Sequence, residues 1–195
     1  MEPHFAHFPF LLVVDLEATC DDRNRKPSLV PKEEMETIEI GAVLVETRTL
    51  EKVDELGIFV KPVRHPTLTD FCKQLTSITQ RDVDAAPLFP EAAASVARFL
   101  AGRRALFCSW GDYDKKQLAQ DAAFHKMRLP FGQEHLNLKK RFSEQLGEPK
   151  RFGMDGALAR VGLALEGTHH RGIDDARNIA RLLPWITGRR TLSRR

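Results

Sequence analysis

FLLVVDLE, at positions 10–17, is the stretch that decides the fold, because an apolar run leads directly into two acids. The run is too short to cross a bilayer, which takes roughly 18 to 20 apolar residues. Side chains of a strand alternate between its faces, so Asp15 and Glu17 share one face, roughly 6.5 Å apart along the strand. Two carboxylates at that spacing can grip cations or bracket a substrate. Taken alone, the triplet fits better with a strand end whose acids face water.

Further strands and helices follow this first strand. The short connection between the strands expected at 37–46 and 53–62 favours antiparallel pairing. Three leading strands followed by alternating strands and helices predict an α/β fold, a mixed sheet with helices packed on it. The other expected elements are strands at 104–110 and 136–138, helices at 68–75, 89–100 (ended by Gly102), 114–126, 141–145 and 155–161, and a last helix from about 173 that ends or kinks before Pro184.

Composition places the chain among ordinary globular proteins. Its 195 residues suit one domain, and a net charge of +3 with a pI near 8.8 is compatible with a polyanionic partner. Three cysteines without metal or redox spacing favour a reduced, cytoplasmic environment, and Met1–His4 lacks the basic start of a secretory signal. Basic clusters are either solvated surface or the flanks of a phosphate site; they lie at 23–26, 139–141, 150–151 and 189–195.

Two further acids lie at the starts of later helices, each on the apolar side of its helix. Asp175 lines up with Ile179 and Leu182 on the buried stripe of the last helix, although an acid in a first turn is also favoured by the helix dipole alone. Asp114 lines up with the apolar side of its helix, which favours it over Asp112 as a ligand. Asp112 suits an N-cap or a supporting position.

Burying an acid costs folding free energy unless something compensates it. Several such acids in one chain suggest one compensator, and divalent cations are the first candidate because they bind carboxylate oxygens. His170, on the loop before Asp175, could take a proton from water near neutral pH. His169 competes with it for this role.

Taken together, these residues resemble the histidine-bearing branch of the DEDD superfamily of 3′-to-5′ exonucleases (the DEDDh type), most closely the Eri-type (three-prime histone-mRNA exonuclease) group and its bacterial relatives. The resemblance covers roughly residues 10–183. Ser77 stands where the group usually has glycine, which puts the loop shape there in question. The matching stretches are VVDLEATC (13–20), EIGA (39–42), DFC (70–72), LTSITQ (75–80), WGDYD (110–114) and HRGIDDARNIA (170–180).

The resemblance implies a ribonuclease-H-like five-stranded mixed sheet flanked by helices, in one exonuclease domain over 1–195 with its core at about 10–187 and a basic tail at 188–195. It implies two Mg²⁺ or Mn²⁺ ions held by Asp15, Glu17, Asp114 and Asp175, and it selects His170 as the base. It places Ala18 and Thr19 beside the terminal nucleotide, and Leu75 and Thr76 near its sugar and base.

The expected activity is removal of nucleotides from single-stranded or 3′-overhanging ends, with RNA favoured over DNA and no membrane partner. A DNA-directed exonuclease and a non-catalytic nucleic-acid-binding regulatory module are the alternatives. Trp110 and Phe152 are candidates for base stacking, with core packing the favoured role for each.

Overall fold

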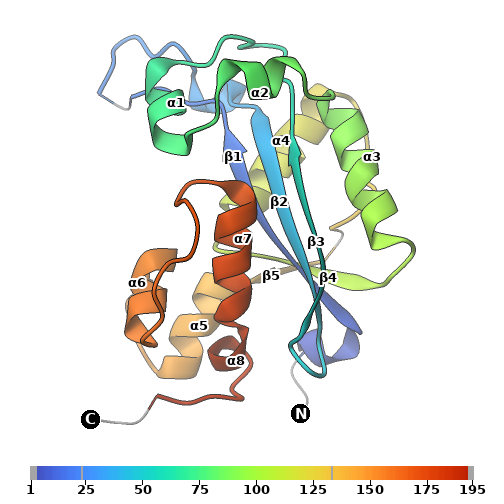
Figure 1. Cartoon of the computed structure of the whole chain (residues 1–195), viewed down its shortest axis with the longest axis vertical. Helices are drawn as coiled ribbons and strands as arrows, with labels where there is room; N and C mark the ends of the chain where they lie inside the picture. Colours follow the sequence, from blue (N-terminus) through green and yellow to red (C-terminus); the bar gives the residue numbers. More distant parts are fainter. Residues whose placement is uncertain (1–3, 23, 133, 193–195) are drawn as a thin grey trace.

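The protein is described here by a computed structural model covering residues 4–22, 24–132 and 134–192. Part of the expected basic clusters (residues 23 and 193–195) and Met1–Pro3 lie outside the described residues. Five strands form one mixed sheet in the order β3-β2-β1-β4-β5, with helices on both faces (Figure 1). The strands are β1 (Phe10–Ala18), β2 (Thr37–Glu46), β3 (Lys52–Phe59), β4 (Ala105–Ser109) and β5 (His135–Asn137).

Strand β1 lies at the centre of the sheet and sets its polarity. It pairs antiparallel with β2 and parallel with β4, which in turn pairs parallel with β5. Strands β2 and β3 are antiparallel, as predicted. The carboxyl ends of β1, β4 and β5 therefore meet at one edge of the sheet, which we call the carboxyl edge.

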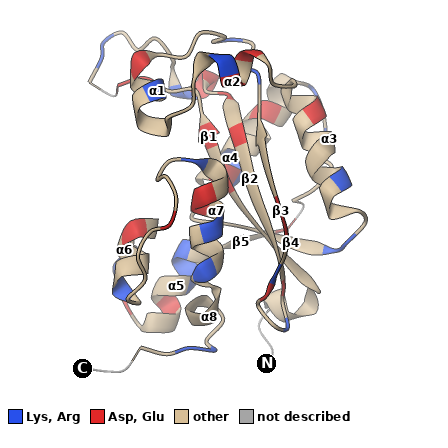
Figure 2. Ribbon diagram, viewed as in Figure 1, with Lys and Arg blue, Asp and Glu red and all other residues tan. Residues whose placement is uncertain are grey.

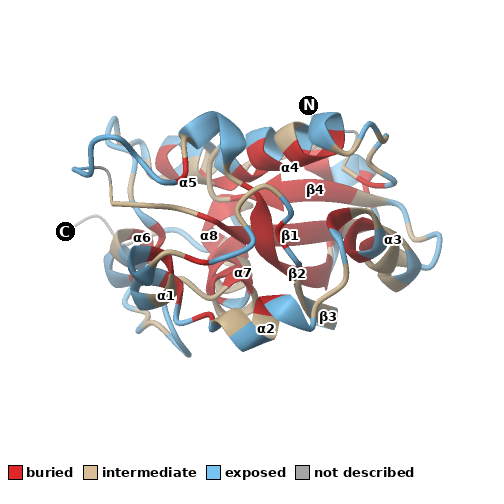
Figure 3. Cartoon of the chain, turned by 90° about the horizontal axis from the view of Figure 1, so that it is seen from above, coloured by how far each residue is buried: buried red, intermediate tan, exposed pale blue. Residues whose placement is uncertain are grey.

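Residues of β1 alternate between two apolar cores, and this alternation orients the acids. Leu11 and Val13 belong to the core under α5–α8, whereas Leu12 and Val14 belong to the core under α3 and α4. Figure 3 shows the buried strands between these two helical layers. The helices are α1 (Asp70–Thr76), α2 (Gln80–Asp84), α3 (Phe89–Leu100), α4 (Tyr113–Phe124), α5 (Leu138–Leu146), α6 (Met154–Arg160), α7 (Gly172–Arg181) and α8 (Leu183–Ile186), with short 3₁₀ turns at His4–His7 and Lys32–Glu34.

Several element ends differ from the sequence prediction for identifiable reasons. Strand β3 stops at Phe59 rather than 62, because the Lys61 N–H donates to the carbonyl oxygen of Pro87 (2.9 Å) and leaves the sheet. Helix α5 starts earlier than predicted, since the Asn137 side chain caps its first turn. Helix α2 was not predicted; five residues show no clear period, and a capping box between Thr79 and Asp82 starts it.

The ends of α3 and α7 are set by backbone conformation. Ala101, with φ 48°, takes the left-handed cap of α3, so Gly102 is the second left-handed residue and not the first. Helix α7 stops at Arg181, and Pro184 sits in the first turn of α8. The predicted break before Pro184 is confirmed, because proline lacks the N–H that a helix interior requires.

Within the described residues, every helix is too short or too polar to cross a membrane.

Candidate active site

Three of the predicted acids meet at the carboxyl edge. One carboxylate oxygen each from Asp15, Glu17 and Asp175 lies within 4.8 Å of the others. Asp15 and Glu17 come from the end of β1, and Asp175 from the first turn of α7. Figure 2 shows acidic residues, in red, on both of these elements. Glu17 and Asp175 are only 8% and 5% exposed. The alternation of β1 and the apolar stripe of α7 thus bring together residues that are 158 or more positions apart.

Helix α7 can lie this close to the sheet because two glycines face each other. A Cβ on Gly41 would lie 2.1 Å from the backbone of Gly172, which is a severe clash. The buried Glu39 then holds the start of α7, accepting hydrogen bonds from the Gly172 N–H (2.9 Å) and from Nε of Arg171 (3.1 Å). These contacts fix the position of Asp175 relative to β1.

Asp114 approaches the same place from α4. It is 3% exposed, and its Oδ1 accepts a hydrogen bond from the backbone N–H of Leu16 (3.1 Å), the residue between Asp15 and Glu17. Its oxygens are not within the 4.8 Å group of the other three acids among the described residues. Asp112 occupies the N-cap position of α4, but its side chain makes no capping hydrogen bond and is 3.9 Å from Nδ1 of His135.

The acids raise one another's pKa values. Burial, followed by the negative charges of Asp175 and Glu39, raises the pKa of Glu17 to about 8. Burial and the charge of Asp114 raise the pKa of Asp15 well above its ordinary value. Burial also raises the pKa of Asp114, to about 6, although its hydrogen bond with Leu16 opposes the rise. A buried carboxylate with a raised pKa and no cationic partner is poorly solvated.

This arrangement suits hard divalent cations. Oxygen ligands from several carboxylates are what Mg²⁺ and Mn²⁺ bind, and a dication would stabilise the ionised form of each acid. The residues present therefore fit a divalent metal site, with Asp15, Glu17 and Asp175 supplying its most closely grouped oxygens.

Two adjacent histidines border the acids. Nδ1 of His169 lies 3.1 and 3.2 Å from the two oxygens of Asp175, whereas His170 donates its backbone N–H to Asp175 (3.0 Å). The two rings stack with centroids 4.0 Å apart, and His170 has φ 62°. Burial and the neighbouring His169 lower the pKa of His170. Burial raises the pKa of Asp175, and the His169 contact opposes that rise.

The residues predicted to contact the nucleotide differ in what they expose. Leu75 is 37% exposed, whereas Ala18, Thr19 and Thr76 are buried. The Thr19 hydroxyl accepts the Glu36 N–H (2.9 Å), and the Thr76 hydroxyl donates to the carbonyl oxygen of Cys72 (2.8 Å). Both threonine hydroxyls are thus engaged with backbone groups, that of Thr19 just before β2 and that of Thr76 within α1.

Three further predictions concern this neighbourhood. Ser77 has φ 60° and forms the left-handed cap of α1, so it adopts the conformation that glycine favours. Trp110 donates its indole N–H to the carbonyl oxygen of Phe152 (3.1 Å), and both side chains pack against the core around Phe142. The packing role predicted for these two aromatic residues is confirmed.

Glu39 is the important residue to which the sequence analysis gave no role. An acid inside an otherwise apolar strand was the available signal, since Glu39 lies between Ile38 and Ile40. Its partner, Arg171, lies 132 residues away, and local sequence says nothing about that distance.

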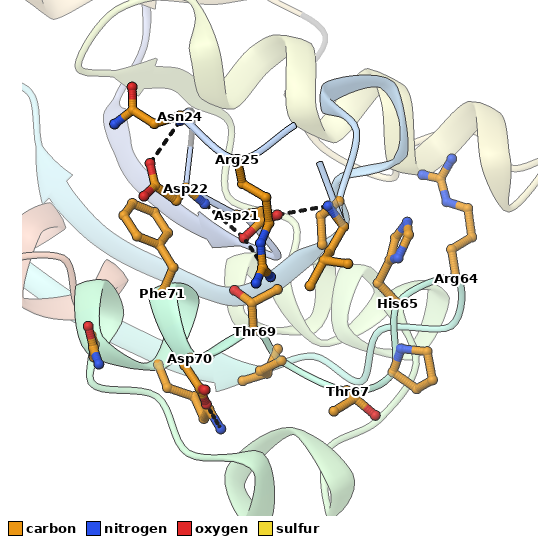
Figure 4. A pocket seen from close by; sticks show the side chains of 16 residues that line it. Asp21, Asp22, Asn24, Arg25, Arg64, His65, Thr67, Thr69, Asp70 and Phe71 are labelled. Atoms are coloured by element: carbon orange, nitrogen blue, oxygen red, sulfur yellow. Dashed lines mark hydrogen bonds and ion pairs between the residues drawn. The ribbon is translucent and has the colours of Figure 1, made fainter. Parts of the chain in front are cut away.

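A hollow of about 890 Å³ lies beside α1 and contains none of the predicted site residues (Figure 4). Two ion pairs lie in this hollow: Arg25 faces Asp21 (3.8 Å), and Lys73 contacts Asp70 (2.7 Å). The Asp21 carboxylate also accepts the Leu29 N–H (2.7 Å), which ties the 21–29 loop together. The residues that line the hollow are Asp21, Asp22, Asn24, Arg25, Leu29, Val30, residues 64–71, Lys73 and Gln74.

The sheet order and the acids at its carboxyl edge define a ribonuclease-H-like exonuclease fold. The chain belongs to the RNase_T exonuclease family, whose model matches residues 12–183. The predicted grouping with DEDDh-type, Eri-like exonucleases and bacterial relatives is confirmed by the similar proteins.

The chain is 33% identical over 195 aligned residues to ERI1 exoribonuclease 3 of Mus musculus, a match that covers 93% of this chain and 55% of the relative. It is 30% identical over 167 residues to the probable 3′-5′ exonuclease KapD of Bacillus subtilis, covering 85% of this chain and 78% of the relative. The solved nuclease domain of 3′hExo, a DEDDh family member bound to rAMP, matches with a TM-score of 0.82 and 28% identity over 94% of this chain and 92% of that chain. The chain spans about half the length of the mouse relative.

Proposed function

We propose that the protein is a metal-dependent 3′-to-5′ exonuclease that hydrolyses nucleotides from the 3′ ends of nucleic acid, with RNA favoured over DNA. The observation that carries the proposal is the meeting of three carboxylates, from β1 and α7, within 4.8 Å. Membership of the exonuclease family supports it. The relatives named as exoribonucleases support RNA as the substrate.

Asp15, Glu17, Asp114 and Asp175 would hold two Mg²⁺ or Mn²⁺ ions. Such ions supply activation of a water molecule and stabilisation of the leaving 3′ oxygen. The burial of Asp114 beside Leu16 supports its inclusion as the fourth ligand.

The chain's own residues handle the proton and the terminal nucleotide. His170 accepts the proton of the attacking water at an imidazole nitrogen, and its lowered pKa keeps that nitrogen unprotonated near neutral pH. His169 is the competing base, although its contact with Asp175 suits an orienting role better. The exposed Leu75 would contact the sugar and base together with Thr76, and the backbone at Ala18 and Thr19 would border the nucleotide.

Release of nucleotides from a labelled 3′ end, with and without Mg²⁺, tests the proposal. We expect release that requires the ion and that is lost in Asp15→Asn and in Asp175→Asn, with the fold retained. Full activity in either variant would contradict the ligand assignment. Binding of nucleic acid without any hydrolysis would favour the non-catalytic module. Single-stranded RNA and DNA of one sequence, assayed side by side, decide between an RNA-directed and a DNA-directed enzyme.

Two organisational points belong to the same proposal. Residues 1–195 form one exonuclease domain with its core at about 10–187 and a basic tail at 188–195, which the family match over 12–183 supports. A cytoplasmic location is supported by three cysteines that form no disulfide.

A further inference from the structure

Cations near the acids fall into two groups, according to whether a carboxylate neutralises them. On the α7 side the arginines are paired: Nε of Arg171 lies 3.1 Å from Glu39, and Arg181 lies 2.8 Å from Glu166. In the hollow beside α1, Arg25 and Lys73 are also paired. Arg64, which also lines the hollow, has no carboxylate partner among the described residues, but its guanidinium lies 4.2 Å from the Phe124 ring centroid and donates to backbone carbonyl oxygens.

The end of the carboxyl edge formed by β4 and β5 differs. Four cationic side chains there, which we call the basic rim, are Lys115, Lys139, Lys150 and Arg151. Among the described residues, no carboxylate oxygen lies within 4.0 Å of any of them. Lys115, Lys150 and Arg151 are exposed and Lys139 is partly exposed. Their charges therefore face solvent without local compensation.

Contacts place the basic rim around the ends of β4 and β5. The stem of Lys139 lies beside Gly111, with its Cδ 4.0 Å from where a Cβ would be. The Lys115 charge is close enough to His135 to contribute to lowering the pKa of that imidazole. Nη1 of Arg151 donates to the carbonyl oxygen of Lys140 (2.9 Å).

The last member of the basic rim extends it toward α6. Nζ of Lys150 lies 5.7 Å from the ring centroid of Phe152. The backbone of Phe152 is held by the indole of Trp110, directly before Gly111. The two halves of the rim, near β4 and near α6, are thus joined through one aromatic contact.

The basic rim begins at the acid cluster. Gly111 precedes Asp114 by three residues, and Asp114 contacts the backbone of β1. At the other end, Arg151 precedes Asp155 of α6 by four residues, and Asp155 is close enough to His170 for its charge to act on that imidazole. Acids also occur along this path, at Asp112 and Asp155, and they leave the four cations in excess.

We propose that the basic rim binds the backbone phosphates of the nucleotides immediately upstream of the 3′-terminal one. The proposal rests on the proposed exonuclease function and adds the direction in which the strand leaves the acid cluster. Lysine and arginine side chains bind phosphates without reading sequence. A strand laid along α1 or α7 would instead meet cations that, apart from Arg64, are already paired with carboxylates.

The triple variant Lys139→Gln/Lys150→Gln/Arg151→Gln tests the path and spares Lys115, which adjoins Asp114. On a long single-stranded oligonucleotide we expect KM to rise about ten- to hundredfold with kcat unchanged. The slope of log KM against log salt should fall by about 2, since each lost phosphate contact on a single strand removes about 0.7. On a dinucleotide, which lacks the upstream phosphates, kcat/KM should stay at the wild-type value.

A matched control removes three positive charges elsewhere. Arg98→Gln/Lys126→Gln/Arg128→Gln alters exposed positions on and after the helices of the α3–α4 face. This variant should keep the KM and the salt slope of the wild type. A control that weakens binding as much as the rim variant would show a response to net charge alone and would overturn the proposal.

The outcomes separate this proposal from the function on which it rests. Wild-type protein without nuclease activity would defeat the exonuclease proposal itself. An active wild type whose rim variant keeps the same KM and salt slope would overturn the rim alone. Equal losses on the oligonucleotide and the dinucleotide would also overturn it, because they indicate damage to the acid cluster. If the triple variant is unstable, Lys150→Glu, at an exposed position, provides the same comparison.

Discussion

Glu17 and Glu39 face each other across strands β1 and β2, yet their surroundings are opposite. Both are nearly inaccessible, at 8% and 2% exposed. Glu39 accepts hydrogen bonds from the guanidinium of Arg171 and from the Gly172 N–H. Glu17 has no hydrogen-bond donor or cation as a side-chain partner among the described residues and lies beside Asp15 and Asp175.

The difference separates acids that serve the fold from acids that are available to a ligand. Glu36 is also buried, and its carboxylate is satisfied by hydrogen bonds as that of Glu39 is. It accepts the N–H groups of Val63, Arg64 and His65 at 2.7–3.0 Å. A buried carboxylate with its hydrogen bonds satisfied is structural. One without them costs stability, and the protein would tolerate that cost where a cation binds.

Glu17→Gln is the strongest test of the difference between Glu17 and Glu39. It keeps the shape of the side chain and removes the charge, so nucleotide release should fall about a thousandfold or more. The thermal midpoint of the metal-free protein should stay the same or rise, because glutamine does not ionise and the cost of protonating or burying the Glu17 carboxylate on folding is gone. Both are measured on one preparation. Retained activity would show that Glu17 is not a ligand.

The pH dependence of metal-free stability should also follow from Glu17. The folded-state pKa of about 8 exceeds the ordinary 4.5, so the folded state binds more protons between these values. The free energy of unfolding should therefore fall, by a few kcal/mol, as pH rises from about 4.5 to about 8, and then level off. The lowered pKa of His170 opposes this trend.

Urea denaturation in the presence of EDTA, repeated across this pH range, measures the decrease in the free energy of unfolding. With saturating Mg²⁺ in place of EDTA, the free energy of unfolding should depend less on pH. Glu17→Gln should reduce the slope. Stability that increases with pH across the window would contradict the raised pKa.

The two histidines extend the comparison to the loop before α7. His170→Ala should lower kcat about a hundredfold, as expected for loss of a general base. His169→Ala should have a smaller effect on kcat and should raise the pKa of Asp175 further, because its contact at 3.1 Å opposes the effect of burial. Parallel kcat measurements decide between them. A reversed order would assign the proton transfer to His169.

Glu39→Gln should have the smallest effect on activity but a clear effect on stability. It leaves the partly buried Arg171 without its counter-charge, and we expect a loss of about 2 kcal/mol in urea unfolding. Glu55→Gln, which breaks an ion pair with the exposed Arg177, is the control and should cost less than about 1 kcal/mol. Equal losses of stability in the two variants would mean that burial of the Glu39–Arg171 ion pair does not increase its contribution to the free energy of unfolding.

Local periodicity accounts for the parts of the fold that the sequence predicted well. The 89–100 helix and the 37–46 strand match α3 and β2 in their bounds, since long regular patterns leave little choice. The five-residue α2 and the early start of α5 depend on side-chain caps at Thr79 and Asn137, which periodicity does not register.

The candidate site divides in the same way. Its acids stand on regular elements, so their faces could be predicted: Asp15 and Glu17 by alternation in a strand, and Asp175 by the helical stripe it shares with Ile179. The histidine contact was harder to predict, because His169 and His170 lie on a loop where the backbone takes φ 62° and no period orients the rings.

The amino-acid sequence by itself determined which acids turn toward the core and, through its motifs, the family to which the chain belongs. Those properties follow from neighbours two, three or four positions apart. The tertiary structure alone decided that α7 lies against β2 through Gly41 and Gly172, and that Glu39 is neutralised while Glu17 is not. Such pairings join segments more than a hundred residues apart, where packing and solvation of the whole fold select the partner.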